Sequence, residues 1–218
     1  FLLQILVGLN RIGETVEPLK RELAATDPKD RPAVISTIPR FFSRATDKKL
    51  ASSVVEQVLA DYLNPPNVGV AALTTMGRMR LENGDTAGAM EAATRAQALS
   101  PLDEGPALLA LLMISPKTPQ AEGIVKKYLD GNPRYEVRMD YARTLLDAQR
   151  YAESAEQLQR ITTEKPDYSP AWLVRGSLEF QDLAGDSAGD GRSLYWLIRS
   201  RPQDRRSDPE VVSRLKQG

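Results

Sequence analysis

Apolar residues recur at intervals of three and four along most of the chain, and prolines divide this pattern into segments of helical length. In one such segment the apolar positions are Val16, Leu19, Leu23 and Ala24. This spacing places apolar side chains on one face of an α-helix, whereas a half-buried strand would show strict alternation. The pattern therefore predicts an all-α protein without a β-sheet.

Three prolines, Pro101, Pro133 and Pro166, end three successive segments at nearly regular intervals. Proline ends a helix because it lacks an N–H and disfavours helical backbone at the preceding residue. In phase with these prolines, small residues recur where two helices cross closely, and large residues recur where they fill the space between layers. The small positions are Gly77, Ala89, Ala93, Ala96, Ala121 and Ala142; the large ones are Leu73, Met76, Val125, Tyr128, Tyr141, Leu145, Leu158 and Ile161.

Pro166, Trp172 and Gly176 have the spacing of a junction between two tetratricopeptide (TPR) repeats, and the phased pattern resembles this family over about 100 residues. The resemblance implies an all-α, right-handed superhelical solenoid of about five helix pairs plus a C-terminal cap. Three regions are expected: degenerate N-terminal helical repeats over 1–65, clear TPR repeats over 66–182, and an atypical last helix and cap over 183–218, for which partial disorder is the alternative.

Helix boundaries can be predicted in the degenerate region. Asp30 is expected to be an N-cap, with a proline in the first turn after it, and Pro39 is expected to kink or interrupt that helix. The next helix should begin at Asp47 and end at Asn64. Near the C-terminus we expect a glycine-rich turn over 185–191, a second helix over 193–201 and a short polar cap helix from residue 207.

Composition narrows the possible functions. The chain has 29 basic and 29 acidic residues, which argues against a nucleic-acid binder with a broad basic surface. It has no cysteine and no histidine, which excludes Ser-His-Asp and Cys-His triads and histidine-based zinc sites.

No cofactor is expected, because the glycines of 185–191 lack the strand and the Gly-Lys-Ser/Thr context of a phosphate loop. The carboxylate pairs Asp140/Asp147 and Glu153/Glu156 are interpreted as solvated helix faces with ion pairs. We therefore expect a protein that is not an enzyme.

The concave surface of the solenoid is the candidate binding site. In TPR proteins the first helix of each pair lines this surface, and repeat positions 2, 5, 9, 12 and 13 point into it. Arg78 and Arg143 occupy position 9 in two repeats and could hold a backbone carbonyl or a carboxylate of a bound segment. The alternative is that they are ordinary solvated arginines. The predicted partner-binding residues are Thr74, Arg78, Leu81, Met139, Arg143, Leu146, Leu173 and Phe180.

A second resemblance is carried by residues 81–85, 99–101, 125–133, 136–146 and 151–155. These stretches resemble one bacterial family, the proteobacterial outer-membrane TPR lipoproteins that act as adaptors for a periplasmic carboxyl-terminal processing protease. The resemblance implies protein partners, namely the protease and cell-wall hydrolases as its substrates, and a periplasmic location with an outer-membrane anchor. A membrane would then be met only through a lipid anchor that is not present in this chain.

Two other functions stay open: a TPR lipoprotein of envelope assembly, for pilus secretin or β-barrel insertion, and a non-catalytic part of a larger enzyme. A cytoplasmic location also stays open. The chain begins at Phe1, without an initiator Met and inside an expected helix, which suggests a fragment or a processed chain.

Overall fold

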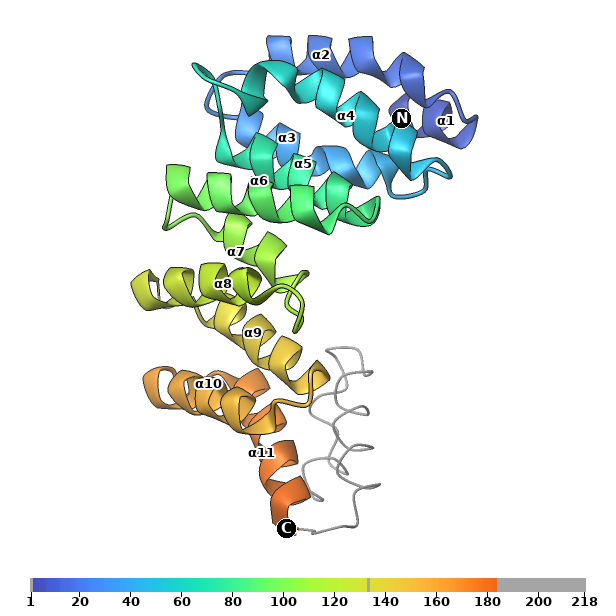
Figure 1. Cartoon of the computed structure of the whole chain (residues 1–218). Helices are drawn as coiled ribbons and strands as arrows, with labels where there is room; N and C mark the ends of the chain where they lie inside the picture. The colour runs from blue at the N-terminus through green and yellow to red at the C-terminus, as the bar shows by residue number, and fades with distance from the viewer. Residues whose placement is uncertain (1, 133, 184–218) are drawn as a thin grey trace. The chain divides into compact units, whose positions relative to one another are not determined.

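The computed structural model describes residues 2–132 and 134–183 and shows helices without any β-strand in these ranges (Figure 1). The all-α prediction is thereby confirmed. The chain forms two compact units, one ending at Pro133 and one beginning at Arg134, which are described separately. The predicted turn over 185–191, the helix over 193–201 and the cap helix lie outside the described residues.

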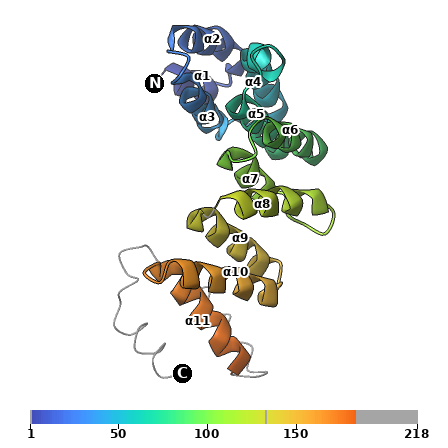
Figure 2. The same cartoon turned by 90° about the vertical axis from the view of Figure 1, so that its left-hand side faces the viewer.

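In unit 1 the helices of residues 70–99 and those of residues 104–131 form two antiparallel pairs (Figures 1 and 2). A short 3-10 segment, η1 (Ile12–Thr15), joins the first two helices. The α-helices are α1 (Leu2–Gly8), α2 (Val16–Ala25), α3 (Arg31–Phe42), α4 (Lys48–Leu63), α5 (Val70–Glu82), α6 (Thr86–Leu99), α7 (Glu104–Leu111) and α8 (Pro119–Gly131).

The predicted boundaries around α3 and α4 are partly correct. Asp47 accepts a hydrogen bond from the Leu50 N–H at 2.9 Å and begins α4 as expected, and Asn64 follows its last residue. Asp30 occupies the N-cap position of α3 as predicted, but its backbone is already helical and its side chain makes no capping bond. α3 is not interrupted at Pro39 and continues to Phe42. The hydroxyl of Thr75 in α5 donates to the carbonyl of Ile35 at 3.3 Å. That carbonyl is the one to which residue 39 would donate if it had an N–H.

The close crossings predicted for the repeats are present in unit 1. A Cβ on Gly77 would lie 2.5 Å from Leu109 Cδ2 in α7 and 3.1 Å from Ala92 Cβ in α6, so only glycine fits without a shift of neighbours. Every other small or large position predicted for this unit is buried, namely Leu73, Met76, Ala89, Ala93, Ala96, Ala121, Val125 and Tyr128. The TPR-type packing of helix pairs is therefore confirmed by the contacts themselves.

Polar contacts join the second helices of successive pairs. Arg95 of α6 donates to the carbonyl of Leu63, the last residue of α4, at 2.7 Å. Gln97 of α6 is buried and donates to the carbonyl of Ile124 in α8 at 2.9 Å. Successive second helices are thus held by side chains that reach for backbone carbonyls, whereas α5 and α7 pack directly through Gly77.

Unit 2 has three described helices: α9 (Tyr135–Asp147), α10 (Tyr151–Glu164) and α11 (Ser169–Leu183). The hydroxyl of Ser154 is buried and donates to the carbonyl of Ala142 at 2.8 Å, which fixes the crossing of α10 with α9. Trp172 is exposed and donates its indole N–H to the carbonyl of Pro166 at 2.8 Å. The predicted buried positions Tyr141, Ala142, Leu145, Leu158 and Ile161 all lie in the core.

Candidate functional site

The predicted binding residues belong to both units, and each unit is considered by itself. In unit 1, two contacts mark the side of α5 that faces α7. Thr74 lies close to Gly105, where an added Cβ would be 3.2 Å from the threonine methyl group, and Gly77 lies against Leu109. Thr74 also donates its hydroxyl to the Val70 carbonyl of its own helix at 2.9 Å. Its side chain is therefore used in packing one first helix against the next.

Arg78 points away from this contact. It follows Gly77 by one residue, which is a rotation of about 100° around the helix axis. Arg78 is exposed, and among the described residues it makes neither an ion pair nor a side-chain hydrogen bond. Leu81, one turn after Gly77, is half-buried beside the contact. Arg78 thus lies on the solvent-exposed side of α5, next to the side that contacts α7.

The open face continues with two leucines that the sequence prediction missed, Leu108 in α7 and Leu112 directly after its last residue. Leu108 precedes Leu109 by one residue, and Leu112 follows Leu108 by one turn; both are exposed, Leu112 to 56%. One repeat length of about 34 residues leads from Thr74 to Leu108 and from Arg78 to Leu112. Adding one repeat length to positions in the preceding repeat would have identified both leucines. Repeat positions assigned backward from Pro133 instead are shifted along the helix, because that repeat is short.

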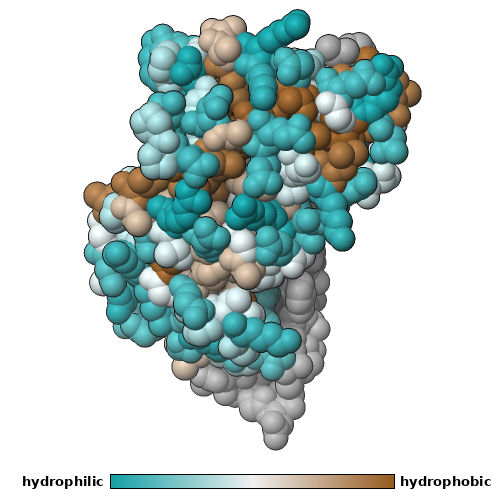
Figure 3. Space-filling model, turned by 45° about the horizontal axis from the view of Figure 1, so that its top comes forward, coloured by the Kyte–Doolittle hydropathy of each residue, from teal (hydrophilic) through white to brown (hydrophobic). Residues whose placement is uncertain are grey.

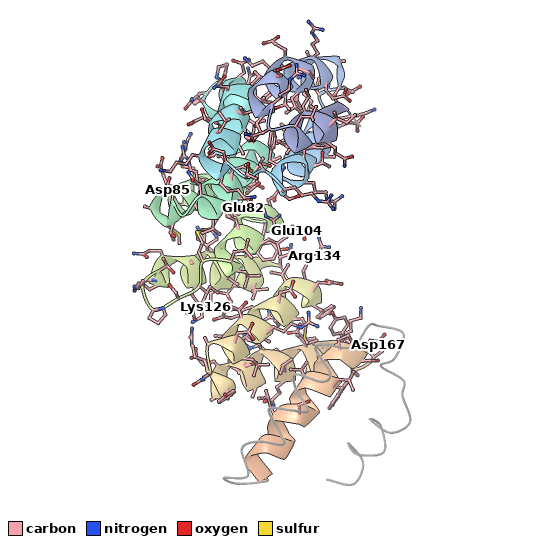
Figure 4. The ribbon with its side chains drawn as sticks, turned by 90° about the vertical axis from the view of Figure 1, so that its right-hand side faces the viewer. Glu82, Asp85, Glu104, Lys126, Arg134 and Asp167 are labelled. Atoms are coloured by element: carbon pink, nitrogen blue, oxygen red, sulfur yellow. The ribbon has the colours of Figure 1, made fainter. Side chains whose placement is uncertain are left out.

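Two acidic residues flank this face. Glu82 follows Arg78 by one turn on α5, and Glu104 precedes Leu108 by one turn on α7 (Figure 4). The face that combines Arg78, Leu81, Leu108 and Leu112 with these carboxylates is called the α5–α7 face below. It offers one cation and three apolar side chains on two helices that pack directly against each other.

In unit 2 the structure differs from two of the predictions. Met139 is only 1% exposed, and Leu146 is also buried; both belong to the cluster that joins α9 to α10 and α11. Their side chains are therefore not presented to a partner. The physical reason is specific to this unit: Met139 and Leu146 are seven residues apart on the same side of α9, and that side packs against α10 and α11.

The remaining predicted residues differ in their availability. Arg143 is partly exposed but already holds Asp140 Oδ1 at 3.2 Å, one turn away on α9. Leu173 is half-buried on α11. Phe180 is part of α11, and its side chain lies outside the described residues. Arg143 would therefore have to give up its ion pair with Asp140 to bind a partner carboxylate, whereas Arg78 has no ion pair with a described residue to give up.

Three of the four carboxylates considered for acid–base chemistry, Asp140, Glu153 and Glu156, take part in ion pairs, as predicted. Besides Asp140, Glu153 pairs with Arg150 at 2.5 Å and Glu156 with Arg160 at 2.7 Å. Within residues 2–132 and 134–183, no group of three or more acidic side chains is arranged to hold a metal ion. None of the helices in these ranges is both long and apolar enough to cross a membrane.

A second feature missed by the sequence analysis is an aromatic and basic cluster in unit 2. Lys165 Nζ lies 5.2 Å from the ring centre of Tyr135 and 5.6 Å from that of Tyr168. Arg175 covers Trp172 at 5.5 Å and donates to the Thr162 hydroxyl at 3.1 Å. These cations are attracted by ring faces within their own unit, so the cluster stabilises the α10–α11 junction.

The comparisons with known proteins yield solved structures only. No family model matches the chain, and no curated protein matches it. One solved structure, MamA MSR-1 C2, is 17% identical, with a TM-score of 0.47, and the match covers 79% of this chain and 95% of that one. Another, MamA AMB-1, is 16% identical, with a TM-score of 0.44, covering 81% and 96%. Similarity at this level says nothing about function. The packing of the helices described above defines the class of protein, an all-α helical-repeat protein of TPR type.

Proposed function

We propose that the protein is a non-catalytic scaffold that binds an extended segment of a partner protein on the α5–α7 face. The observation that carries the proposal is the exposed Arg78, which has no ionic partner in the described part of the chain, next to the exposed Leu108 and Leu112. An exposed cation beside apolar side chains suits a ligand that supplies a carboxylate and an apolar group together.

The spacing of the face defines the ligand further. Packed helices lie about 8–10 Å apart, and an extended chain advances about 3.3 Å per residue. A segment that crosses from α5 to α7 would therefore place an acidic residue on Arg78 and an apolar residue on Leu108 or Leu112 about three positions later. Glu82 would repel a second acidic residue placed further along α5.

The identity of the partner comes from the sequence resemblance. We propose that the scaffold acts as an adaptor that brings a periplasmic carboxyl-terminal processing protease together with its substrates, cell-wall hydrolases among them. It would work in the periplasm, tethered to the outer membrane by a lipid anchor outside this chain. Envelope assembly, for pilus secretin or β-barrel insertion, and service as a non-catalytic part of a larger enzyme are the alternative functions.

Site-specific photo-crosslinking tests the position of the partner. A photoreactive phenylalanine analogue replaces Leu112 on the proposed face or, as a matched control, Leu99, an exposed leucine on the second helix α6. Each variant is irradiated in envelope extract. We expect adducts from position 112 that are absent from position 99. Equal adduct patterns at both positions would remove the α5–α7 face as the site.

The adducts also distinguish the proposed partners. A processing protease or a cell-wall hydrolase crosslinked at position 112 supports the adaptor function. Secretin or barrel-assembly subunits at the same position would replace it with the envelope-assembly function. A catalytic subunit recovered in fixed stoichiometry would indicate part of a larger enzyme.

A further inference from the structure

One end of unit 1 presents apolar side chains to solvent. Ile5 and Leu9 are one turn apart, joined by the hydrogen bond from the Leu9 N–H to the Ile5 carbonyl at 2.9 Å, and so project to the same side. Leu9 is 61% exposed, and Ile5 is exposed beside it. Figure 3 shows apolar residues gathered at the edge of unit 1 where Figure 1 draws α1.

The loop between α3 and α4 lies against this end. The hydroxyl of Thr46 donates to Asn10 Oδ1 at 3.4 Å, directly after Leu9. Leu50, in the first turn of α4, is a third exposed apolar residue at this end. Ile5, Leu9 and Leu50 are together called the α1 patch.

The loop adds a positive charge to the patch. Residues 40–50 contain four basic residues and one acidic residue, although the whole chain is neutral. Arg44 and Lys49 are exposed and make no ion pair with any described residue. The one acidic residue, Asp47, is engaged in capping α4. On the other side, Glu14 is neutralised by Arg11, whose Nη2 lies 2.5 Å from Glu14 Oε2.

We infer that the α1 patch and its basic rim bind the surface of an anionic lipid bilayer. A few apolar side chains surrounded by Lys and Arg are what an interfacial contact requires, because the side chains insert and the cations meet lipid phosphates. A stable protein interface usually needs about 800 Å² on each partner, more than three side chains supply. A second copy paired through this patch would bring like charges together. This surface is distinct from the α5–α7 face and does not depend on the function proposed for it.

Vesicle flotation tests the inference. The chain is mixed with phosphatidylcholine vesicles that contain either no anionic lipid or about 30% phosphatidylglycerol. We expect binding to the anionic vesicles only, weakening as salt is raised. Arg44→Glu with Lys49→Glu should weaken binding by about 25-fold or more, and Leu9→Ser by about tenfold. The charge-matched control, Lys117→Glu with Lys127→Glu, and the apolar control, Leu99→Ser, should bind as wild type.

A fluorescent label distinguishes insertion from simple charge attraction. Because the chain has no cysteine, Leu9→Cys and Leu99→Cys each give a single site for an environment-sensitive dye. We expect a blue shift at position 9 and none at position 99 when anionic vesicles are added. The inference is overturned by equal binding to both vesicle types, or by dye fluorescence at position 9 that does not shift. It is also overturned if the chain fails to bind vesicles and instead forms a dimer, detected by light scattering, that Leu9→Ser abolishes. Loss of binding by the charge-matched control would overturn it as well.

Discussion

The hydroxyl of Thr75 lies 3.3 Å from the carbonyl oxygen of Ile35, at the contact between α5 and α3. The carbonyl lacks its usual helical donor because residue 39 is proline. Thr75 is buried, so this bond replaces a backbone hydrogen bond away from solvent. A side chain of one repeat thus completes the helix of the preceding repeat.

Thr75→Val should lower the free energy of unfolding by about 1–3 kcal/mol, because an isosteric methyl group leaves a buried carbonyl without a donor. Chemical denaturation of the full chain measures the change. The control is the same substitution in a Pro39→Ala background, where residue 39 regains its N–H and Thr75→Val should cost much less. Equal costs in the two backgrounds would show that Thr75 does not compensate for Pro39.

Gly77→Ala should destabilise unit 1 by about 1–2 kcal/mol. Alanine is favoured over glycine in a helix by about 1 kcal/mol, but the new Cβ would lie 2.5 Å from Leu109 and 3.1 Å from Ala92, and overpacking typically costs 1–3 kcal/mol or more. The control is Gly123→Ala in α8, where no atom lies within 4 Å of the new Cβ and a gain of about 0.5–1 kcal/mol is expected. Thermal unfolding of both variants checks the opposite signs.

Asp85→Ala should cost about 1 kcal/mol, because Asp85 caps α6 by accepting the Gly88 N–H at 2.9 Å. Asp30→Ala removes the same group before α3, where no capping bond exists, and should change stability by less than about 0.5 kcal/mol. Denaturant titration of the two variants provides the comparison. Similar costs would mean that charge near a helix N-terminus matters more than the hydrogen bond.

Arg78→Ala should weaken binding of a peptide with an acidic residue three positions before a leucine by about 1.5–3 kcal/mol. Arg143→Ala should weaken binding by less, because Arg143 is already paired with Asp140. Arg21→Ala, an exposed arginine on α2, serves as the control. Isothermal titration calorimetry gives the dissociation constants, and an unchanged value for Arg78→Ala would count against the α5–α7 face.

The pKa of Glu14 should lie below its usual value, because its carboxylate accepts hydrogen bonds from the Arg11 guanidinium. A lowered pKa in the folded state means that the associated stabilisation is present above the unfolded pKa and is lost as pH falls through the folded pKa. NMR titration of the Glu14 carboxyl measures the pKa. Arg11→Ala should return it toward the usual range, and an unaltered pKa in that variant would exclude Arg11 as the cause.

Much of the fold could be predicted because burial and helical period constrain the same residues. Tyr128, Tyr141 and Leu158 were placed in the core from their phase relative to proline alone, and all three are buried. The Asp30 cap could not be predicted with the same success. Capping depends on the backbone angles of a single residue, and many aspartates precede helices without adopting them.

The candidate site was harder to predict than the core. A repeat position fixes the direction of a side chain, but whether it meets solvent depends on the helix beside it. Met139 and Leu146 are buried in the cluster that joins α9 to α10 and α11, whereas Arg78 is exposed to solvent. Leu112 was missed because the short α7 repeat disturbs the count. The exposure of Leu9 could not be predicted from the spacing of apolar residues. That spacing shows which residues share a face of the helix, but not whether another helix covers that face.

The difference between direct packing of first helices and side-chain bridges between second helices has a mechanical consequence for unit 1. Gly77 allows α5 to touch α7 closely, while α4, α6 and α8 are linked through the long side chains of Arg95 and Gln97. Long side chains can follow small displacements without losing their hydrogen bonds, whereas the Leu109 side chain packed on the bare Gly77 backbone leaves little room for movement. Unit 1 should therefore flex mainly by movement of its second helices relative to one another. The first helices α5 and α7 should move little, so that the distance between Arg78 and Leu108 stays nearly constant.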